Sequence, residues 1–197
     1  MVVNETYPLI GLAGTFASGK DTLANYLVAE YNYYQESGGD LIRGLSMKRH
    51  GSMERPQVRE TAQYYRTTYG PQVFIDMQLK NFETHKAVKS GLVINGLRAL
   101  GEAKTLKKMG AMIVFVDAPV ELRYERMKSR SRDKETEITL DEFKTREQTE
   151  WYAGNRDVDF NLRDIKKMAD IVLENRSDLE GFLREAVAKL KLSKRLV

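Results

Sequence analysis

The sequence predicts an α/β fold in which a parallel sheet is covered by helices on both faces. Short apolar runs alternate with longer segments of helical periodicity along nearly the whole chain. Glycine-rich and proline-containing turns separate the two kinds of segment. Strands that alternate with helices indicate a parallel sheet, because parallel neighbours need a crossover between them. Right-handed crossovers then bring the carboxyl ends of the strands, and with them a ligand site, to one edge.

Five segments have the composition of strands. Each is a short run rich in apolar, β-branched or aromatic residues, with turn-forming or polar residues close to its end. The most apolar of them is the run Met112-Ile113-Val114-Phe115-Val116. The expected strands cover residues 7–13, 31–36, 92–95, 111–117 and 171–173.

Helices are expected between these strands, with glycine and proline marking their limits. A helix stops before Gly51, Pro56 opens the next one, Gly70-Pro71 separates that from a third, and Gly110 closes a later helix. The expected helices begin near residue 20, cover 40–50, 55–69, 72–89 and 99–109, begin again near 119, and cover 178–192.

The composition is that of one globular domain. The chain has 197 residues, of which 42% are apolar and 30% charged, and its net charge is +4. A mildly basic chain suits an anionic ligand, whereas the basic run is short and lacks the interleaved aromatic residues expected for nucleic acid. Apolar runs are too short to span a membrane, and we expect a cytoplasmic location. Without cysteine there is no disulfide and no thiolate metal site.

A glycine-framed loop with a lysine follows the first expected strand. It reads Gly14-Thr15-Phe16-Ala17-Ser18-Gly19-Lys20-Asp21-Thr22 and opens onto a helical pattern. This order of strand, loop and helix is typical of a phosphate-binding loop. The glycines let successive N–H groups point inward, the helix start attracts an anion, and Lys20 adds a mobile charge. We therefore expect nucleotide contacts from Gly14, Thr15, Ala17, Ser18, Gly19, Lys20, Asp21 and Thr22.

Two further groups follow strands that end at the same edge. After the second strand, Asp40 begins a helix that its side chain is expected to cap, and Arg43 lies one turn on. Asn95 ends the third strand, and Arg98 follows it. Asn95 stands where P-loop enzymes commonly place an acidic residue that holds the magnesium shell. Both arginines are candidate phosphate ligands, and the alternative is ordinary helix capping with surface arginines.

Asp117 ends the fourth expected strand. It is a candidate to supply the carboxylate that is missing at position 95, and it is also well placed to cap the helix that follows.

After this strand, arginines recur at steps of three and four, which places them on one helical face. They are Arg123, Arg126 and Arg130, with Arg132 beyond. Arginines near the loop suit phosphoryl transfer, which needs charge stabilisation, although a solvated basic face has the same pattern.

The chain as a whole resembles the adenylate kinase-like nucleoside monophosphate kinases. The similar segments are residues 14–22, 39–43, 95–98, 125–130 and 169–175, in that order. Within this group it is most similar to the small P-loop kinases related to dephospho-CoA kinase and deoxynucleoside monophosphate kinase. The resemblance implies a P-loop NTPase fold with a five-stranded parallel sheet in the order 2-3-1-4-5.

The resemblance also implies a division of the single domain. The core would be residues 5–37, 91–127 and 169–192, with an acceptor-binding helical insert at 38–90 and a short helical lid at 128–168. The highly charged part of that lid, residues 128–154, is open to two interpretations, a mobile cover over the site or a solvated helical hairpin.

Particular residues take roles by the same resemblance. Thr22, rather than Asp21, would provide the hydroxyl on the magnesium side. Arg43 and Arg98 would hold the acceptor phosphate, and Asp40 would lie at the acceptor subsite. The residues expected to face the donor phosphates are Arg126 and Arg130, and Arg146 resembles a cover arginine.

These observations predict ATP-dependent phosphoryl transfer, with Mg²⁺, to a (deoxy)nucleoside monophosphate. A phosphate acceptor needs positioning and charge cancellation rather than a base. Transfer to a hydroxyl, as in dephospho-CoA kinase, would need a general base, for which Asp40 is the candidate. A third alternative is an ATP-binding regulatory protein with low turnover, because Asn95 removes a carboxylate. The sequence gives no indication of the oligomeric state or the base preference.

Overall fold

The computed structural model describes residues 8–129, 138–176 and 178–192, and it confirms the α/β class. Its strands form one five-stranded sheet in which neighbours pair in parallel, in the order β2-β3-β1-β4-β5. This is the order that the resemblance implies. The strands are β1 (Leu9–Gly14), β2 (Tyr33–Ser37), β3 (Gly91–Leu97), β4 (Met112–Asp117) and β5 (Ile171–Glu174).

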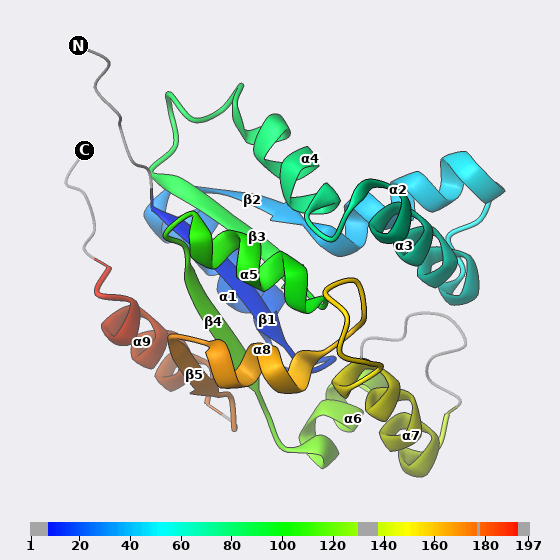
Figure 1. The fold of residues 1–197 in the computed structure, drawn as a ribbon. Coiled ribbons are helices and arrows are strands. Elements are labelled where there is room, and N and C mark those ends of the chain that lie inside the picture. Colours follow the sequence, from blue (N-terminus) through cyan, green and yellow to red (C-terminus); the bar gives the residue numbers. More distant parts are fainter. Residues whose placement is uncertain (1–7, 130–137, 177, 193–197) are drawn as a thin grey trace.

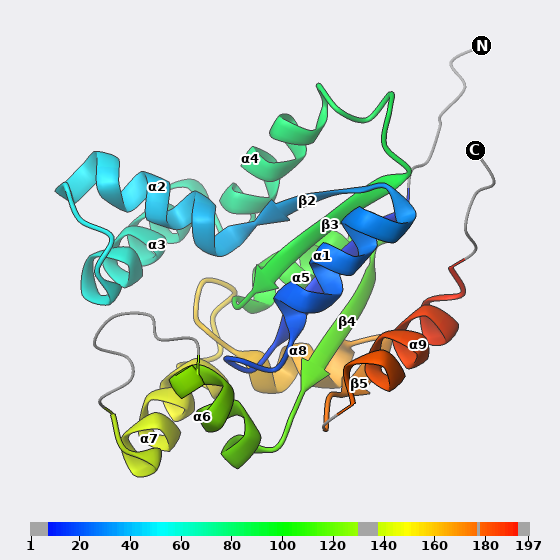
Figure 2. The ribbon, with the colours of Figure 1, turned by 180° about the vertical axis from the view of Figure 1, so that it is seen from behind.

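Helices cover both faces of this sheet, as Figures 1 and 2 show from opposite sides. One face is covered by α1 and α9, and the other by α4, α5 and α8. The helices are α1 (Lys20–Tyr31), α2 (Gly38–His50), α3 (Arg55–Tyr69), α4 (Val73–Phe82), α5 (Leu100–Lys108), α6 (Val120–Ser129), α7 (Leu140–Trp151), α8 (Leu162–Met168) and α9 (Leu179–Leu190).

The sheet is buried on both faces because apolar side chains of its central strand point to both of them. In β1, Ile10 and Leu12 pack with α1 and α9, whereas Leu9 and Ala13 pack with the helices of the opposite face. Successive side chains of a strand point to opposite faces, so an apolar run such as that of β1 belongs in the middle of a covered sheet. The loop that follows β1 is therefore held on a rigid, central strand.

Two helical pairs flank the carboxyl ends of the strands. On one side α2 and α3 pack together around Ile42, Ala62 and Phe74. On the other side α6 and α7 share a small apolar cluster with Phe16 of the glycine loop. Figures 1 and 2 show these pairs on either side of the edge where β1 and β3 end.

The structure differs from the sequence-based expectations at several element limits. The helix expected over 72–89 ends at Phe82. The hydroxyl of Thr84 bonds back to the carbonyl of Asn81, a local bond that competes with the helical ladder. Within the ranges expected for the insert and the lid, α4 and α8 pack against the sheet itself. The pairs that project beside the sheet edge are therefore α2–α3 and α6–α7.

Candidate active site

The loop between β1 and α1 has a backbone that few residues can adopt. Gly14 and Gly19 have φ values of +143° and +104°, and Ala17 has +58°. A Cβ atom on Gly14 would lie 2.0 Å from the carbonyl oxygen of Val116, and one on Gly19 would lie 2.3 Å from Nδ2 of Asn175. Both positions thus require glycine, because the backbone has a positive φ and because a Cβ atom would not fit. Because α1 begins at Lys20, its first unpaired N–H groups face this loop, where they favour an anion.

Lys20 lies across the loop. Its Nζ donates to the carbonyl oxygen of Thr15 at 2.8 Å, and the N–H of Ser18 turns back to the same oxygen at 3.3 Å. The Lys20 side chain is half-buried. An ammonium group in this place would meet a phosphate group that the loop amides bind. Thr22 follows in the first turn of α1 and is also half-buried.

Asp117 fixes the loop from the side of β4. Its Oδ1 accepts the hydroxyl of Thr15 at 3.0 Å and the N–H of Ala118 at 2.9 Å, and its Oδ2 accepts Nζ of Lys166 at 2.7 Å. Burial raises the pKa of the Asp117 carboxyl, but the bonds from Lys166, Ala118 and Thr15 outweigh burial and hold this pKa below its ordinary value. Both carboxylate oxygens are occupied by these partners. The contacts favour a positioning and capping role over a place in the magnesium shell.

Asn175 fixes the loop from the side of β5 and is not among the site residues predicted from the sequence. Its Nδ2 donates to the carbonyl oxygen of Ser18 at 2.9 Å, and its Oδ1 accepts Nη2 of Arg126 at 3.0 Å. Asn175 therefore connects Arg126, a predicted donor-phosphate ligand, to the loop. Its place directly after a parallel strand was the available signal, because strand ends meet at one edge.

Arg123, the first arginine of the run on α6, contacts other groups of the protein in a way that supports the fold. It is buried, its Nε donates to the carbonyl oxygen of Ala118 at 2.7 Å, and its guanidinium forms an ion pair with Glu147 of α7. It also reaches the carbonyl oxygen of Phe16 at 3.4 Å. These contacts attach α7 to α6 and to the loop. Arg130 and Arg132 lie outside the described residues.

The predicted acceptor residues come from two elements. Arg98 follows β3 and pairs with Glu150 of α7. Arg43 and Asp40 pair with each other at 2.5 Å on α2, and the Asp40 side chain is 71% exposed. The expectation that Asp40 caps this helix is wrong. The helix begins two residues earlier, and the hydroxyl of Ser37 accepts the N–H of Asp40.

Asp21 and Asn95 lie together between α1 and β3. Nδ2 of Asn95 donates to Oδ1 of Asp21 at 2.7 Å. Asn95 is buried, whereas Asp21, directly after Lys20, is exposed. The two residues in which this chain departs from common P-loop patterns are thus in direct contact. In the described ranges, no three His, Cys, Asp or Glu residues gather closely enough to hold a metal ion by themselves.

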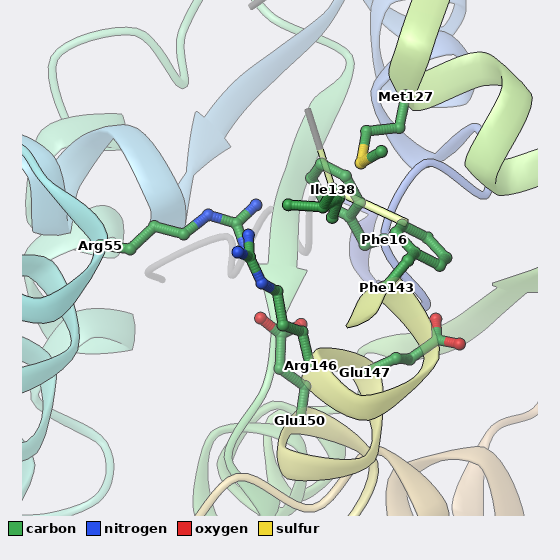
Figure 3. A pocket seen from close by; sticks show the side chains of 8 residues that line it. All are labelled: Phe16, Arg55, Met127, Ile138, Phe143, Arg146, Glu147 and Glu150. Atoms are coloured by element: carbon green, nitrogen blue, oxygen red, sulfur yellow. The ribbon is translucent and has the colours of Figure 1, made fainter. Parts of the chain in front are cut away.

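A pocket beside the loop is lined by residues from both helical pairs (Figure 3). Arg55 enters it from α3 and Arg146 from α7, and their guanidinium groups point toward each other. The Arg55 guanidinium lies 5.2 Å from the ring centroid of Phe16, which belongs to the glycine loop. Arg55 gave no signal in the sequence beyond its place before Pro56. The pocket is lined by Phe16, Arg55, Met127, Ile138, Phe143, Arg146, Glu147 and Glu150.

Known proteins of two kinds are similar to this chain in sequence. A family profile described as an AAA domain matches residues 10–150. A UPF0200 protein of Methanococcus vannielii is 31% identical over 185 residues, which cover 93% of this chain and 95% of that protein. A UPF0200 protein of Hyperthermus butylicus is 28% identical over 187 residues and covers 94% of both chains.

Solved structures show the same fold at low sequence identity. TT1252 from Thermus thermophilus matches with a TM-score of 0.60 and 21% identity, covering 95% of this chain and all of that one. A shikimate kinase from Bacteroides thetaiotaomicron matches with a TM-score of 0.55 and 13% identity, covering 95% of this chain and all of that one. A gluconokinase from Sinorhizobium meliloti matches with a TM-score of 0.52 and 14% identity, covering 93% of this chain and 91% of that one. The fold is thus that of the P-loop kinases.

None of the helices among the described residues has the length and apolar character that crossing a membrane requires.

Proposed function

Because the chain belongs to the AAA domain family and to the UPF0200 proteins, and has a P-loop kinase fold, we propose that it transfers the γ-phosphoryl group of ATP, with Mg²⁺, to a small acceptor that already carries a phosphate. A (deoxy)nucleoside monophosphate is the leading acceptor. The observation that carries the proposal is the gathering of arginines from separate elements around one glycine loop.

The donor side is supported by the contacts of the loop. Backbone amides of residues 14–20 and the start of α1 would hold the β- and γ-phosphates, and Lys20 would follow the phosphoryl group that moves. Arg126 is held toward the loop through Asn175. Mg²⁺, when bound with the nucleotide, neutralises part of the phosphate charge, with the Thr22 hydroxyl on its side of the loop.

The acceptor side is supported by its charge. Arg98 pairs with Glu150, and Glu150 lines the pocket that Arg55 and Arg146 enter. A guanidinium binds a phosphate with two parallel hydrogen bonds, so these cations suit an anionic acceptor. Asp40, the candidate base for a hydroxyl acceptor, accepts a hydrogen bond from Arg43. In our proposal Asp40 orients Arg43 at the acceptor subsite, and Arg43 binds the acceptor phosphate.

An acceptor screen tests this function. ADP release from ATP and Mg²⁺ would be measured by a coupled assay with each common nucleoside or deoxynucleoside monophosphate, and in parallel with dephospho-CoA as a hydroxyl acceptor. We expect acceptor-dependent ADP release with at least one monophosphate. Turnover with dephospho-CoA alone would replace the proposal by transfer to a hydroxyl. ATP binding without acceptor-dependent release would replace it by a regulatory role.

A further inference from the structure

The contact between Asp21 and Asn95 joins two positions of the loop region that differ from common P-loop proteins. The residue after the loop lysine is usually Ser or Thr, and the residue that ends the neighbouring strand is commonly acidic. Here the first is an acid and the second an amide. A carboxylate is therefore present in this region, but on α1 instead of β3.

The amide of Asn95 has a fixed orientation. Its Nδ2 donates to Oδ1 of Asp21 at 2.7 Å, and the opposite orientation would place two oxygen atoms against each other. The residue is only 4% exposed, and among the described residues its Oδ1 has no hydrogen-bond partner. A buried oxygen without a donor costs about 1–3 kcal/mol. This atom is thus suited to a donor that arrives with a ligand, such as a water molecule held by a cation.

The other carboxylates described around the loop have different partners. Asp117 accepts bonds from Thr15, Ala118 and Lys166. Glu147 and Glu150 are paired with arginines. Asp21, in contrast, is exposed in the first turn of α1, beside the lysine that contacts the phosphates in the proposed function. Its negative charge is available to a cation at that place.

We propose that Asp21 and Asn95 together form a divalent-cation subsite, in which Asp21 carries the negative charge that the end of β3 lacks. The pair would hold water ligands of the cation. Mg²⁺ keeps several waters and is usually bound by one or two carboxylates together with substrate phosphates, so this set of groups fits it. The inference rests on the proposed function, because the cation is bound together with the phosphates of the nucleotide.

Binding measurements test the subsite without requiring turnover. The affinity for ADP is measured by calorimetry in EDTA, and the affinity of the ADP complex for Mn²⁺ is measured by electron paramagnetic resonance. For Asp21→Asn we expect the affinity for Mn²⁺ to fall by about 10–100-fold, the range for groups that orient metal ligands. Its affinity for ADP in EDTA should remain at least that of the wild type, since a negative charge has been removed.

A charge exchange provides the decisive comparison. In the double variant Asp21→Asn with Asn95→Asp, the hydrogen bond is reversed and the carboxylate returns to the end of β3. We expect it to recover the wild-type affinity for Mn²⁺ to within about threefold (about 0.65 kcal/mol). Glu30→Gln removes the same charge from the far end of α1 and serves as the matched control.

The outcomes separate the two proposals. Wild-type affinity for Mn²⁺ in Asp21→Asn would overturn the subsite and leave the kinase function standing, as would a double variant no better than Asp21→Asn. If the wild-type protein does not bind ADP at all, the proposed function falls and the subsite falls with it. Thermal unfolding of each variant confirms that the folded protein is being compared.

Discussion

At the scale of single residues, Lys20 is the most exacting test of the proposed chemistry. Its ammonium lies over the loop, in contact with the carbonyl oxygen of Thr15. We expect Lys20→Ala to lose phosphoryl transfer almost completely, because the moving phosphoryl group would lose the charge that accompanies it. The single-turnover rate of ADP formation measures this loss. Lys48→Ala, an exposed lysine on α2, is the control and should retain the wild-type rate.

Arg43 and Arg98 test the assignment of the acceptor side. We expect Arg43→Ala and Arg98→Ala each to weaken acceptor binding by about 1.5–3 kcal/mol, the contribution of a hydrogen bond to a charged group. The affinity for ATP should change much less. Separate titrations of donor and acceptor measure the two effects, and equal losses for both ligands would contradict the assignment.

Glu150 gives a matched test of the same arginine. It pairs with Arg98 in the structure, so a phosphate that binds Arg98 competes with the Glu150 carboxylate. Glu150→Gln removes the competing charge and leaves the shape nearly unchanged. We expect this variant to bind the acceptor more tightly than the wild type, as measured in the same titration. Weaker binding would indicate that Arg98 needs Glu150 to hold it in place.

At the scale of elements, a buried ion pair fastens α3 to α5. The side chains of Arg66 and Glu102 are 1% and 4% exposed, and their atoms approach to 2.7 Å. The second oxygen of Glu102 accepts the backbone N–H groups of Arg98 and Ala99 at the start of α5. We expect Glu102→Ala to lower the free energy of unfolding by about 3–5 kcal/mol, because it leaves a buried guanidinium without its counter-charge.

Urea denaturation measures this loss, and a double variant separates its causes. Arg66→Met with Glu102→Leu removes both charges and keeps most of the volume. We expect it to unfold at a higher urea concentration than Glu102→Ala, since no buried charge is left alone. A double variant as unstable as the single one would mean that the cap on α5 matters more than the ion pair.

A second connection between elements joins the glycine loop, β4 and α8 through Asp117. The pKa of this carboxyl is lower in the folded protein than its ordinary value. Ionised Asp117 therefore stabilises the fold at neutral pH, and this contribution is lost as the pH falls through the lowered pKa. We expect Asp117→Asn to lower the free energy of unfolding near pH 7 by about 1–3 kcal/mol and to lower it less in acid. Urea denaturation across this pH range checks the difference, which would stay constant if Asp117 did not titrate.

At the scale of the whole molecule, the architecture was predictable because its causes are local. Apolar runs and turn residues mark the strands, and the handedness of crossovers places their carboxyl ends at one edge. Asn95, Asp117 and the glycine loop all follow or end such strands and so were predicted to lie together, and Asn175 follows a strand in the same way. The limits of α2 and α4 were predicted less well, because Ser37 and Thr84 form local bonds that composition does not reveal.

The pairing of charges was not predictable. Arg98 pairs with a residue 52 positions later, and Arg123 with one 24 positions later. Both partners, Glu150 and Glu147, lie on α7, so the pairing depends on how that helix packs beside the sheet edge. A charged helix offers many such partners with nearly the same local sequence. Arg55 reaches the pocket for the same kind of reason, through the packing of α3.

The arrangement of Arg55 and Arg146 leads to a prediction about the molecule as a whole. These guanidinium groups point toward each other in the pocket from opposite helical pairs (Figure 3), so an anion placed between them would be bound by both. A ligand with two nucleosides joined by a chain of phosphates would supply that anion. It should therefore draw α3 and α7 together and slow hydrogen exchange in the α7 peptides.

A double-mutant cycle with that ligand measures whether the two arginines act together. We expect Arg55→Ala and Arg146→Ala each to weaken its binding by about 1.5–3 kcal/mol. The double variant should lose less than the sum, by about 0.5–3 kcal/mol, because either arginine alone leaves the anion incompletely held. Arg184→Ala on α9 is the control. Strictly additive losses would mean that the arginines bind separate groups, and the two helical pairs would then have no common anion to hold them together.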